Sequence, residues 1–191
     1  MKLIRVFTIL VLVVVLASSA FGFDGLRKGF VFGGGLGFTP GARWAIDNAR
    51  GEEEDVDETL SGVAANLLLG YAWNEHNMIV FEGNVAVTKS DWFFDEQVAQ
   101  GFDGFAWYHY FGPQGKSFFS TVGLGLYYFK LENYDANDYG AAFMIGGGYE
   151  FTRHIQVGAY FAAGRTEMQL FITKHEMSHK QVNIIVSAIA F

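Results

Sequence analysis

The feature that most constrains this chain is an alternation of side-chain type with a period of two residues. It recurs in eight runs, which cover residues 28–38, 61–73, 78–88, 102–111, 118–128, 141–151, 155–164 and 181–191. In most runs Phe, Leu, Ile and Val alternate with Gly, Ala, Asn, Gln or Glu, whereas 102–111 is aromatic at both parities and 181–191 alternates weakly. Successive side chains of a strand point to opposite faces, so the pattern predicts eight strands and an all-β fold.

The position of the charged residues indicates what surrounds these strands. Charges lie mostly between the runs, whereas a soluble sandwich or lipocalin would carry them on its outer face. A face of large apolar side chains opposite a face of small and polar ones is typical of a barrel with lipid outside and a narrow interior. Each run has about 10 residues, enough for a tilted strand to cross a bilayer. The sequence therefore predicts an eight-stranded antiparallel up-and-down transmembrane β-barrel.

The connections between the runs alternate in length, as they do in outer-membrane barrels. Short turns are predicted at 74–77, 113–116 and 152–154, and long loops at 39–60, 89–101, 129–140 and 165–180. Aromatic residues gather at the run ends on the short-turn side, where a girdle at the membrane interface is expected. The predicted girdle consists of Trp73, Tyr110, Phe111, Tyr149, Phe151 and Phe191.

The first residues have the pattern of a cleaved signal peptide. Lys2 and Arg5 precede an apolar stretch at 6–16 that is too short to span a bilayer, and small residues end at Ala20. Residues 1–20 are therefore predicted to be the signal peptide and 21–191 the barrel domain. Removal of Lys2 and Arg5 leaves 13 − 2 = 11 basic residues against 20 acidic ones, a net charge of −9 that argues against a nucleic-acid partner. There is no Cys, which excludes disulfides and thiolate metal sites.

Several segments resemble the small outer-membrane β-barrel family of Gram-negative bacteria, to which OmpX and the membrane domain of OmpA belong. These segments are "KGFVFGGGLGF", the "GYAW" hairpin, "WYHYFGP" with "FFSTVGLGLYY", and "GGGYEF". The resemblance implies an outer-membrane location, with outer-membrane lipid, lipopolysaccharide and the barrel-assembly machinery as partners. It also implies that the terminal Phe191 is the assembly signal. Ile185 and Ile189 match the alternate apolar positions before it, and Ser187 departs from them.

Polar residues on the small-residue face are predicted to form an interior network. Ionised groups away from water need partners, and the nearby cations Lys28 and Arg27 are candidates for the two carboxylates. The alternative is a narrow path that prefers cations, which eight strands leave little room for. The residues assigned to the network are Asn66, Glu82, Asn84, Glu150 and Gln156.

Two polar segments raise the question of metal binding. His175-Glu176-Met177-Ser178-His179 has the H-E-x-x-H letters of a zinc protease, but it lies in the predicted last loop and no third ligand follows it. It is therefore interpreted as a polar loop, with no metal, cofactor or catalytic residue assigned. The first long loop carries six acids and is interpreted as solvated, with divalent cations such as those bridging lipopolysaccharide phosphates as the alternative partner. These acids are Glu52, Glu53, Glu54, Asp55, Asp57 and Glu58.

The function predicted from these features is that of a non-enzymatic integral outer-membrane protein. Its role would be structural, adhesive or a minor, porin-like permeability. One alternative is a small outer-membrane enzyme that acts on lipid or lipopolysaccharide, which requires a catalytic group at the lipid-facing rim. The other is a soluble periplasmic binder of the lipocalin type.

Overall fold

The computed structural model describes residues 26–47, 53–54, 60–90, 96–131, 137–170 and 173–191. The predicted signal peptide over 1–20 lies outside these ranges. So does most of the acidic loop, of which only the backbone of Glu53 and Glu54 is described. Within the described ranges there is no helix that is long and apolar enough to cross a membrane.

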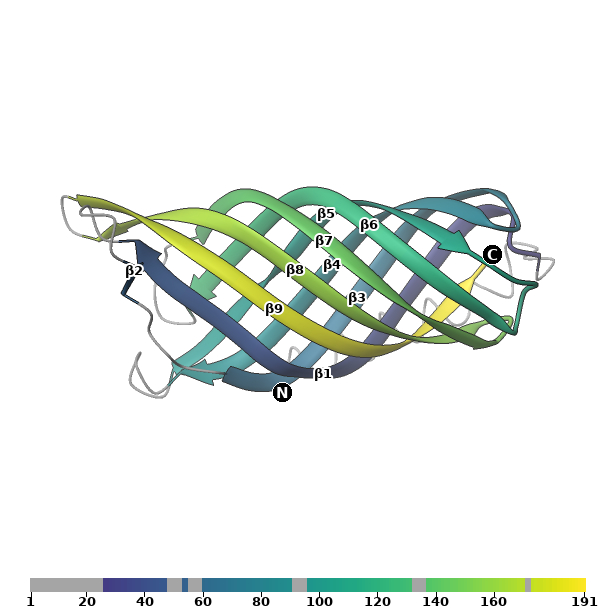
Figure 1. Ribbon diagram of the computed structural model, residues 1–191, viewed down its shortest axis with the longest axis horizontal. Coiled ribbons are helices and arrows are strands. Elements are labelled where there is room, and N and C mark those ends of the chain that lie inside the picture. Colours follow the sequence, from purple (N-terminus) through teal and green to yellow (C-terminus); the bar gives the residue numbers. More distant parts are fainter. Residues whose placement is uncertain (1–25, 48–52, 55–59, 91–95, 132–136, 171–172) are drawn as a thin grey trace, which may run out of the picture.

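The described residues form a closed antiparallel barrel (Figure 1). Its strands are β1 (Gly29–Asp47), β2 (Glu53–Glu54), β3 (Leu60–Asn74), β4 (Asn77–Ser90), β5 (Glu96–Tyr110), β6 (Ser117–Leu131), β7 (Asn137–Thr152), β8 (Ile155–Leu170) and β9 (Thr173–Ala190). Each long strand pairs with its neighbours in sequence, and β9 pairs with β1 to close the ring. The two-residue β2 only pairs with the end of β1. The eight-stranded up-and-down barrel predicted from the sequence is confirmed.

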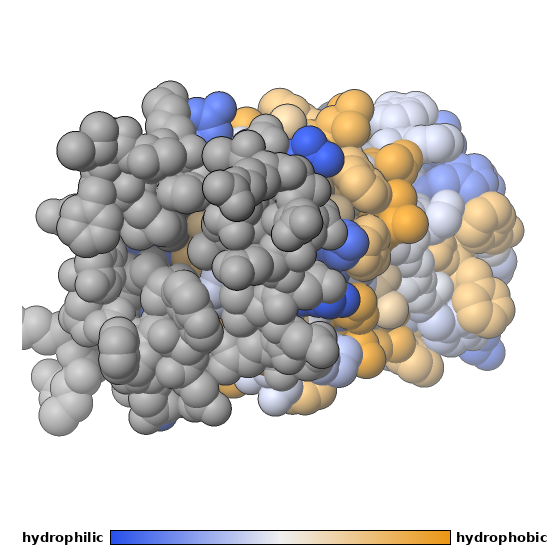
Figure 2. Space-filling model, turned by 60° about the vertical axis from the view of Figure 1, so that its left-hand side comes forward, coloured by the Kyte–Doolittle hydropathy of each residue, from blue (hydrophilic) through white to orange (hydrophobic). Residues whose placement is uncertain are grey.

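The two faces of the wall follow the predicted parity. Large apolar side chains such as Phe30 and Leu124 point outward and are 77% and 72% exposed, while Val31 and Gly123 beside them are buried. Figure 2 shows apolar residues gathered in a band on the outer wall, with polar residues beside it. Closure leaves no strand edge within the band, because every long strand has two neighbours.

The strand that the sequence left without an orientation is β5. Phe105 and Trp107 point outward, whereas Tyr108 and Tyr110 are fully buried in the interior. The register explains the choice, because Phe105 pairs with Phe81 of β4 and is T-shaped to it, with ring centroids 5.8 Å apart. The neighbouring strands therefore decide which of the two aromatic faces points outward.

The predicted long loops are wrong in extent, because the strands continue beyond the apolar band. The largest difference concerns 165–180, where β8 runs to Leu170 and β9 begins at Thr173, so most of the predicted loop is paired strand. Backbone groups continue to pair wherever an adjacent strand offers partners, even when the side chains are polar. The short turns are confirmed as brief connections at 75–76, 111–116 and 153–154.

Candidate functional site

All five residues predicted to form the interior network lie inside the barrel. The most exposed of them is Asn66, at 7%. Their strands place them there because each stands at the parity opposite to the lipid-facing residues. The structure divides this interior into three zones, which are the short-turn end, the centre and the loop end.

The short-turn end is closed by a buried ion pair between Arg27 and Glu150. Arg27 Nη2 lies 2.5 Å from Glu150 Oε2, and both side chains are almost fully buried. The guanidinium carbon lies 3.7 Å from the ring centroid of Tyr110, a cation–π contact. Tyr110 in turn donates from its hydroxyl to Gln156 Oε1 at 2.8 Å. Of the two cations proposed as partners, the structure selects Arg27, while Lys28 is exposed.

Arg27 also ties the short turns to one another. Its Nη1 donates to the carbonyl of Glu75 in the β3–β4 turn, and its backbone N–H donates to Gln114 Oε1 at 3.1 Å. Gly115, whose φ is +88°, donates its N–H to Glu150 Oε2 at 2.5 Å. The positive φ favours glycine at this position of the β5–β6 turn. One residue from before β1 thus connects β3–β4, β5–β6 and β7.

The centre of the barrel contains a second carboxylate, Glu82, with uncharged donors. Tyr108 donates its hydroxyl to Glu82 Oε2 at 2.7 Å, and Asn84 Nδ2 lies 3.4 Å from Oε1. Asn183 extends the network from β9 by donating to Asn84 Oδ1 at 2.6 Å. Ser187, the residue that departs from the terminal apolar pattern, donates to Asn66 Oδ1 at 3.1 Å. Its departure is explained by this interior hydrogen bond.

The loop end is filled by aromatic side chains around His179. Its ring stacks on Tyr127 with centroids 4.9 Å apart and lies 5.0 Å from Phe129, and its Nε2 is 2.8 Å from Thr166 Oγ1. Trp44 is also buried here, 6.3 Å from the Phe129 ring. On β9, His179 is one residue nearer to the loop end than the exposed Lys180, and it lies on the loop side of the apolar band. Burial lowers the pKa of His179 to about 3, so the imidazole is neutral at physiological pH.

The placement of His179 also corrects the interpretation of the H-E-x-x-H letters. They lie on strand β9, not in a loop and not on a helix. Residues four apart on a strand share a face but are separated by roughly 13 Å, too far for two imidazoles to bind one ion. Among the residues that the structure describes, no group of three or more His, Asp and Glu side chains could hold a metal ion.

Two members of the predicted aromatic girdle are wrong. Phe191 is 2% exposed and packs inside the barrel, and Tyr110 is fully buried. Phe191 follows the parity of Ile185 and Ile189, which are also buried, whereas Ile184 and Val186 face outward. The terminal ring therefore helps to fill the short-turn end instead of anchoring at the interface. Trp73, Phe111 and Phe151 are exposed as predicted, and Tyr149 is partly exposed.

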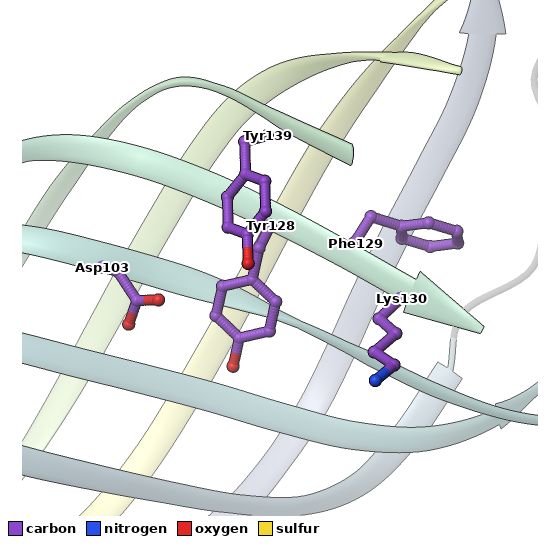
Figure 3. Close-up of a pocket in the computed structure, with 5 residues that line it drawn as sticks. All are labelled: Asp103, Tyr128, Phe129, Lys130 and Tyr139. Carbon is purple, nitrogen blue, oxygen red and sulfur yellow. The ribbon is translucent and has the colours of Figure 1, made fainter. Parts of the chain in front are cut away.

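Sequence reasoning missed a polar pocket in the outer wall (Figure 3). Its volume is about 290 Å³, and its lining consists of Asp103 on β5, Tyr128, Phe129 and Lys130 on β6, and Tyr139 on β7. Asp103 pairs with Leu126 and Tyr128 pairs with Tyr139, so the polar groups share the lipid-facing parity. The signal in the sequence is Asp103, the single acid in the aromatic run 102–111. Both faces of that run are aromatic, so the run alone does not show which face points outward.

No protein-family model and no curated protein matches the chain. Solved structures that match it include the outer membrane protein OprG from Pseudomonas aeruginosa, which is 14% identical with a TM-score of 0.49, over 88% of this chain and 99% of that one. Neisserial surface protein A is 11% identical with a TM-score of 0.49, over 84% and 97%. Ail, the attachment invasion locus protein of Yersinia pestis, is 12% identical with a TM-score of 0.43, over 84% and 99%. The assignment of this chain as a closed antiparallel β-barrel rests on its own strand pairing, in which β9 returns to β1.

Proposed function

We propose that the chain is a non-enzymatic integral protein of the outer membrane, with a closed interior and a structural or adhesive role. The observation that carries the proposal is that polar side chains lie inside the barrel and apolar side chains lie outside, the reverse of a soluble protein. Glu82 and Asn84 are buried inside, while Phe30 and Leu124 face outward. A soluble binder of the lipocalin type would expose this apolar band to water, which makes lipid the better-supported surrounding.

The filled interior favours a structural or adhesive role over permeability. Arg27 and Glu150 close one end, and the aromatic residues around His179 fill the other. Between them, the hydrogen bonds of Glu82 with Tyr108 and Asn84 occupy the centre. A conducting pore would require these groups to separate and expose two buried carboxylates.

A lipid-modifying enzyme is the weaker alternative. The wall pocket faces lipid, but its lining of Asp103, Tyr128, Phe129, Lys130 and Tyr139 includes neither Ser nor His. The serine nucleophile activated by a neighbouring base, familiar from hydrolases, is therefore not present in that lining.

The first test asks whether the chain is a membrane barrel. Protein expressed with its own N-terminus should fractionate with outer membranes, require detergent for extraction and migrate differently on detergent gels before and after boiling. The reason is that a closed ring of backbone hydrogen bonds resists detergent until heated. Recovery in the soluble fraction with identical mobility in both gel lanes would refute the membrane assignment.

The second test addresses the closed interior. Folded protein inserted into planar lipid bilayers is expected to give no steady conductance. Arg27→Ala, which removes the side chain at the centre of the short-turn plug, serves as the comparison and should show more frequent opening events. Stable single-channel steps from the unmodified protein would instead assign it a permeability role.

A further inference from the structure

We propose that the wall pocket binds the phosphorylated sugar headgroup of a glycolipid from the leaflet on the loop side of the barrel. The inference rests on the proposed membrane location. It adds a ligand site that the closed interior does not provide. Three features of the pocket support it, namely a carboxylate in an unusual position, the aromatic rings beside it and a cation at its outer border.

The carboxylate of Asp103 is the unusual feature, because it belongs to the lipid-facing parity of β5. Its neighbours across the strands are Gly83 on β4 and Leu126 on β6. An ionisable side chain exposed to hydrocarbon is unfavourable and marks a functional site when no structural reason is present. The two oxygens of the Asp103 carboxyl group can accept hydrogen bonds from hydroxyl or amide donors of a ligand.

Two glycines create the floor on which these side chains lie. A Cβ at Gly83 would be 3.0 Å from Asp103 Oδ1, and a Cβ at Gly101 would be 2.9 Å from the Tyr128 hydroxyl. The Asp103 and Tyr128 side chains therefore lie over glycine backbone, where a larger residue would fill the space. The pocket of about 290 Å³ is at the lower end of the range for ligand sites, which suits one sugar ring with its phosphate.

The remaining groups are arranged in the order that such a headgroup requires. Figure 3 shows Tyr128 between Asp103 and Lys130, with Tyr139 beside it. Sugar hydroxyls would donate to Asp103, the amphipathic tyrosine rings would cover the apolar face of the ring, and the Lys130 ammonium would bind the phosphate. An anion alone would gain nothing from the carboxylate, so the combination favours a ligand with both hydroxyls and phosphate.

The rim around the pocket has the charge that a phosphorylated leaflet would attract. Five exposed basic residues on different strands mark the loop-side border of the apolar band: Arg43, Lys89, Lys130, Arg165 and Lys180. This basic rim contrasts with the acidic balance of the whole chain, which has 20 Asp and Glu residues against 13 Lys and Arg. Phosphates held at this level place the sugar beside Tyr128 and the acyl chains along the apolar band below.

The test measures binding of purified diphosphoryl lipid A to the folded protein in detergent micelles, by native mass spectrometry over a lipid titration. Asp103→Asn and Lys130→Gln should each weaken binding about tenfold, the loss expected of one charge-assisted hydrogen bond. Lys180→Gln is the matched control, because it removes the same charge from the rim outside the pocket. It should change affinity by no more than about twofold, in line with an exposed ion pair.

Three outcomes would overturn the proposal. Equal losses in Lys130→Gln and Lys180→Gln would reduce the effect to general attraction by the rim. Competition by millimolar inorganic phosphate would assign the pocket to a free anion. Phosphatidic acid binding as tightly as lipid A would show that no sugar is recognised.

The state of the protein is checked on the same samples by the heat-dependent gel shift. A missing shift in the unmodified protein contradicts the membrane barrel itself, whereas a normal shift without lipid A binding contradicts only the pocket proposal. If Asp103→Asn alone loses the shift, Tyr139→Leu takes its place. That variant keeps an apolar lipid-facing side chain and should weaken binding several-fold.

Discussion

The two ends of the barrel are closed by different chemistry. At the short-turn end an arginine and a carboxylate form a buried ion pair that also hydrogen-bonds to backbone groups of the turns. At the loop end a neutral histidine stacks on Tyr127 and contacts Phe129, with Thr166 as its hydrogen-bond partner. A buried ion pair is destabilised chiefly by the loss of one partner, whereas a buried neutral histidine is destabilised by protons. The two ends should therefore respond to different perturbations.

The largest expected effect is from Arg27→Ala, which leaves Glu150 buried without its cation. Breaking a buried pair in this way costs about 3–5 kcal/mol. The free energy of unfolding, measured by urea titration of protein in lipid vesicles, should fall by about that amount. Arg153→Ala is the control, because Arg153 is exposed in the β7–β8 turn at the same end. Similar losses in the two variants would contradict the importance of the plug.

A second effect at the short-turn end concerns Phe191. Because its ring is buried, Phe191→Ala should lower the free energy of unfolding by about 3 kcal/mol, the lower part of the range for buried Phe to Ala. If Phe191 is also the assembly signal, its deletion should reduce the amount inserted in the outer membrane. A polar tag added after Phe191 keeps the ring and masks the terminus. Reduced insertion of the tagged protein without loss of stability would separate the signal from the packing.

The loop end should instead respond to pH. The pKa of His179 in the folded protein is about 3, below its ordinary value near 6.5. Between these two pH values the unfolded state binds a proton at His179 and the folded state does not. Stability is then complete above pH 6.5 and is lost as the pH falls towards 3. The loss is about 1.4 kcal/mol per pH unit, or about 2 kcal/mol between pH 6.5 and 5.

Trp44 provides the measurement, because it is buried in the same cluster as Phe129. In a variant that keeps Trp44 as its sole tryptophan, acrylamide quenching should increase on acidification. The same variant with His179→Phe should show no such increase over this range. Equal quenching curves with and without the histidine would show that another group controls the loop end.

The smallest effect is expected from the H-E-x-x-H letters. Replacing His175 and Glu176 with Ala should change neither assembly nor zinc content, because the strand spacing separates His175 from His179. Zinc in the purified protein, measured by elemental analysis, should stay below one ion per chain in both forms. Stoichiometric zinc that disappears in the double variant, together with peptidase activity, would restore the protease interpretation.

Local pattern was enough to predict the faces of most strands and the interior position of Glu82 and Glu150. It was not enough for the ends of the strands. The stretch 165–180 is mostly polar and its pattern predicts a loop, yet β8 and β9 continue to pair through most of it. Side-chain alternation reports the extent of the apolar band, whereas strand length depends on whether a neighbouring strand continues to offer hydrogen bonds.

The wall pocket was missed for a related reason. Asp103 lies in an aromatic run whose two parities look alike, so its outward direction is visible only after pairing with Gly83 and Leu126 is known. The same limit applies to Phe191, for which the sequence pattern predicts an interfacial ring although the structure buries it.

The sequence by itself determined that the chain is a closed eight-stranded barrel with an apolar outside and a polar inside, since a period of two residues is a property of each strand alone. Only the tertiary structure decided which polar groups meet. Arg27 pairs with Glu150, 123 residues away in the sequence, and Ser187 hydrogen-bonds to Asn66, 121 residues away. Such partners are set by strand register and by the curvature of the closed wall, and neither is contained in the alternation of any single strand.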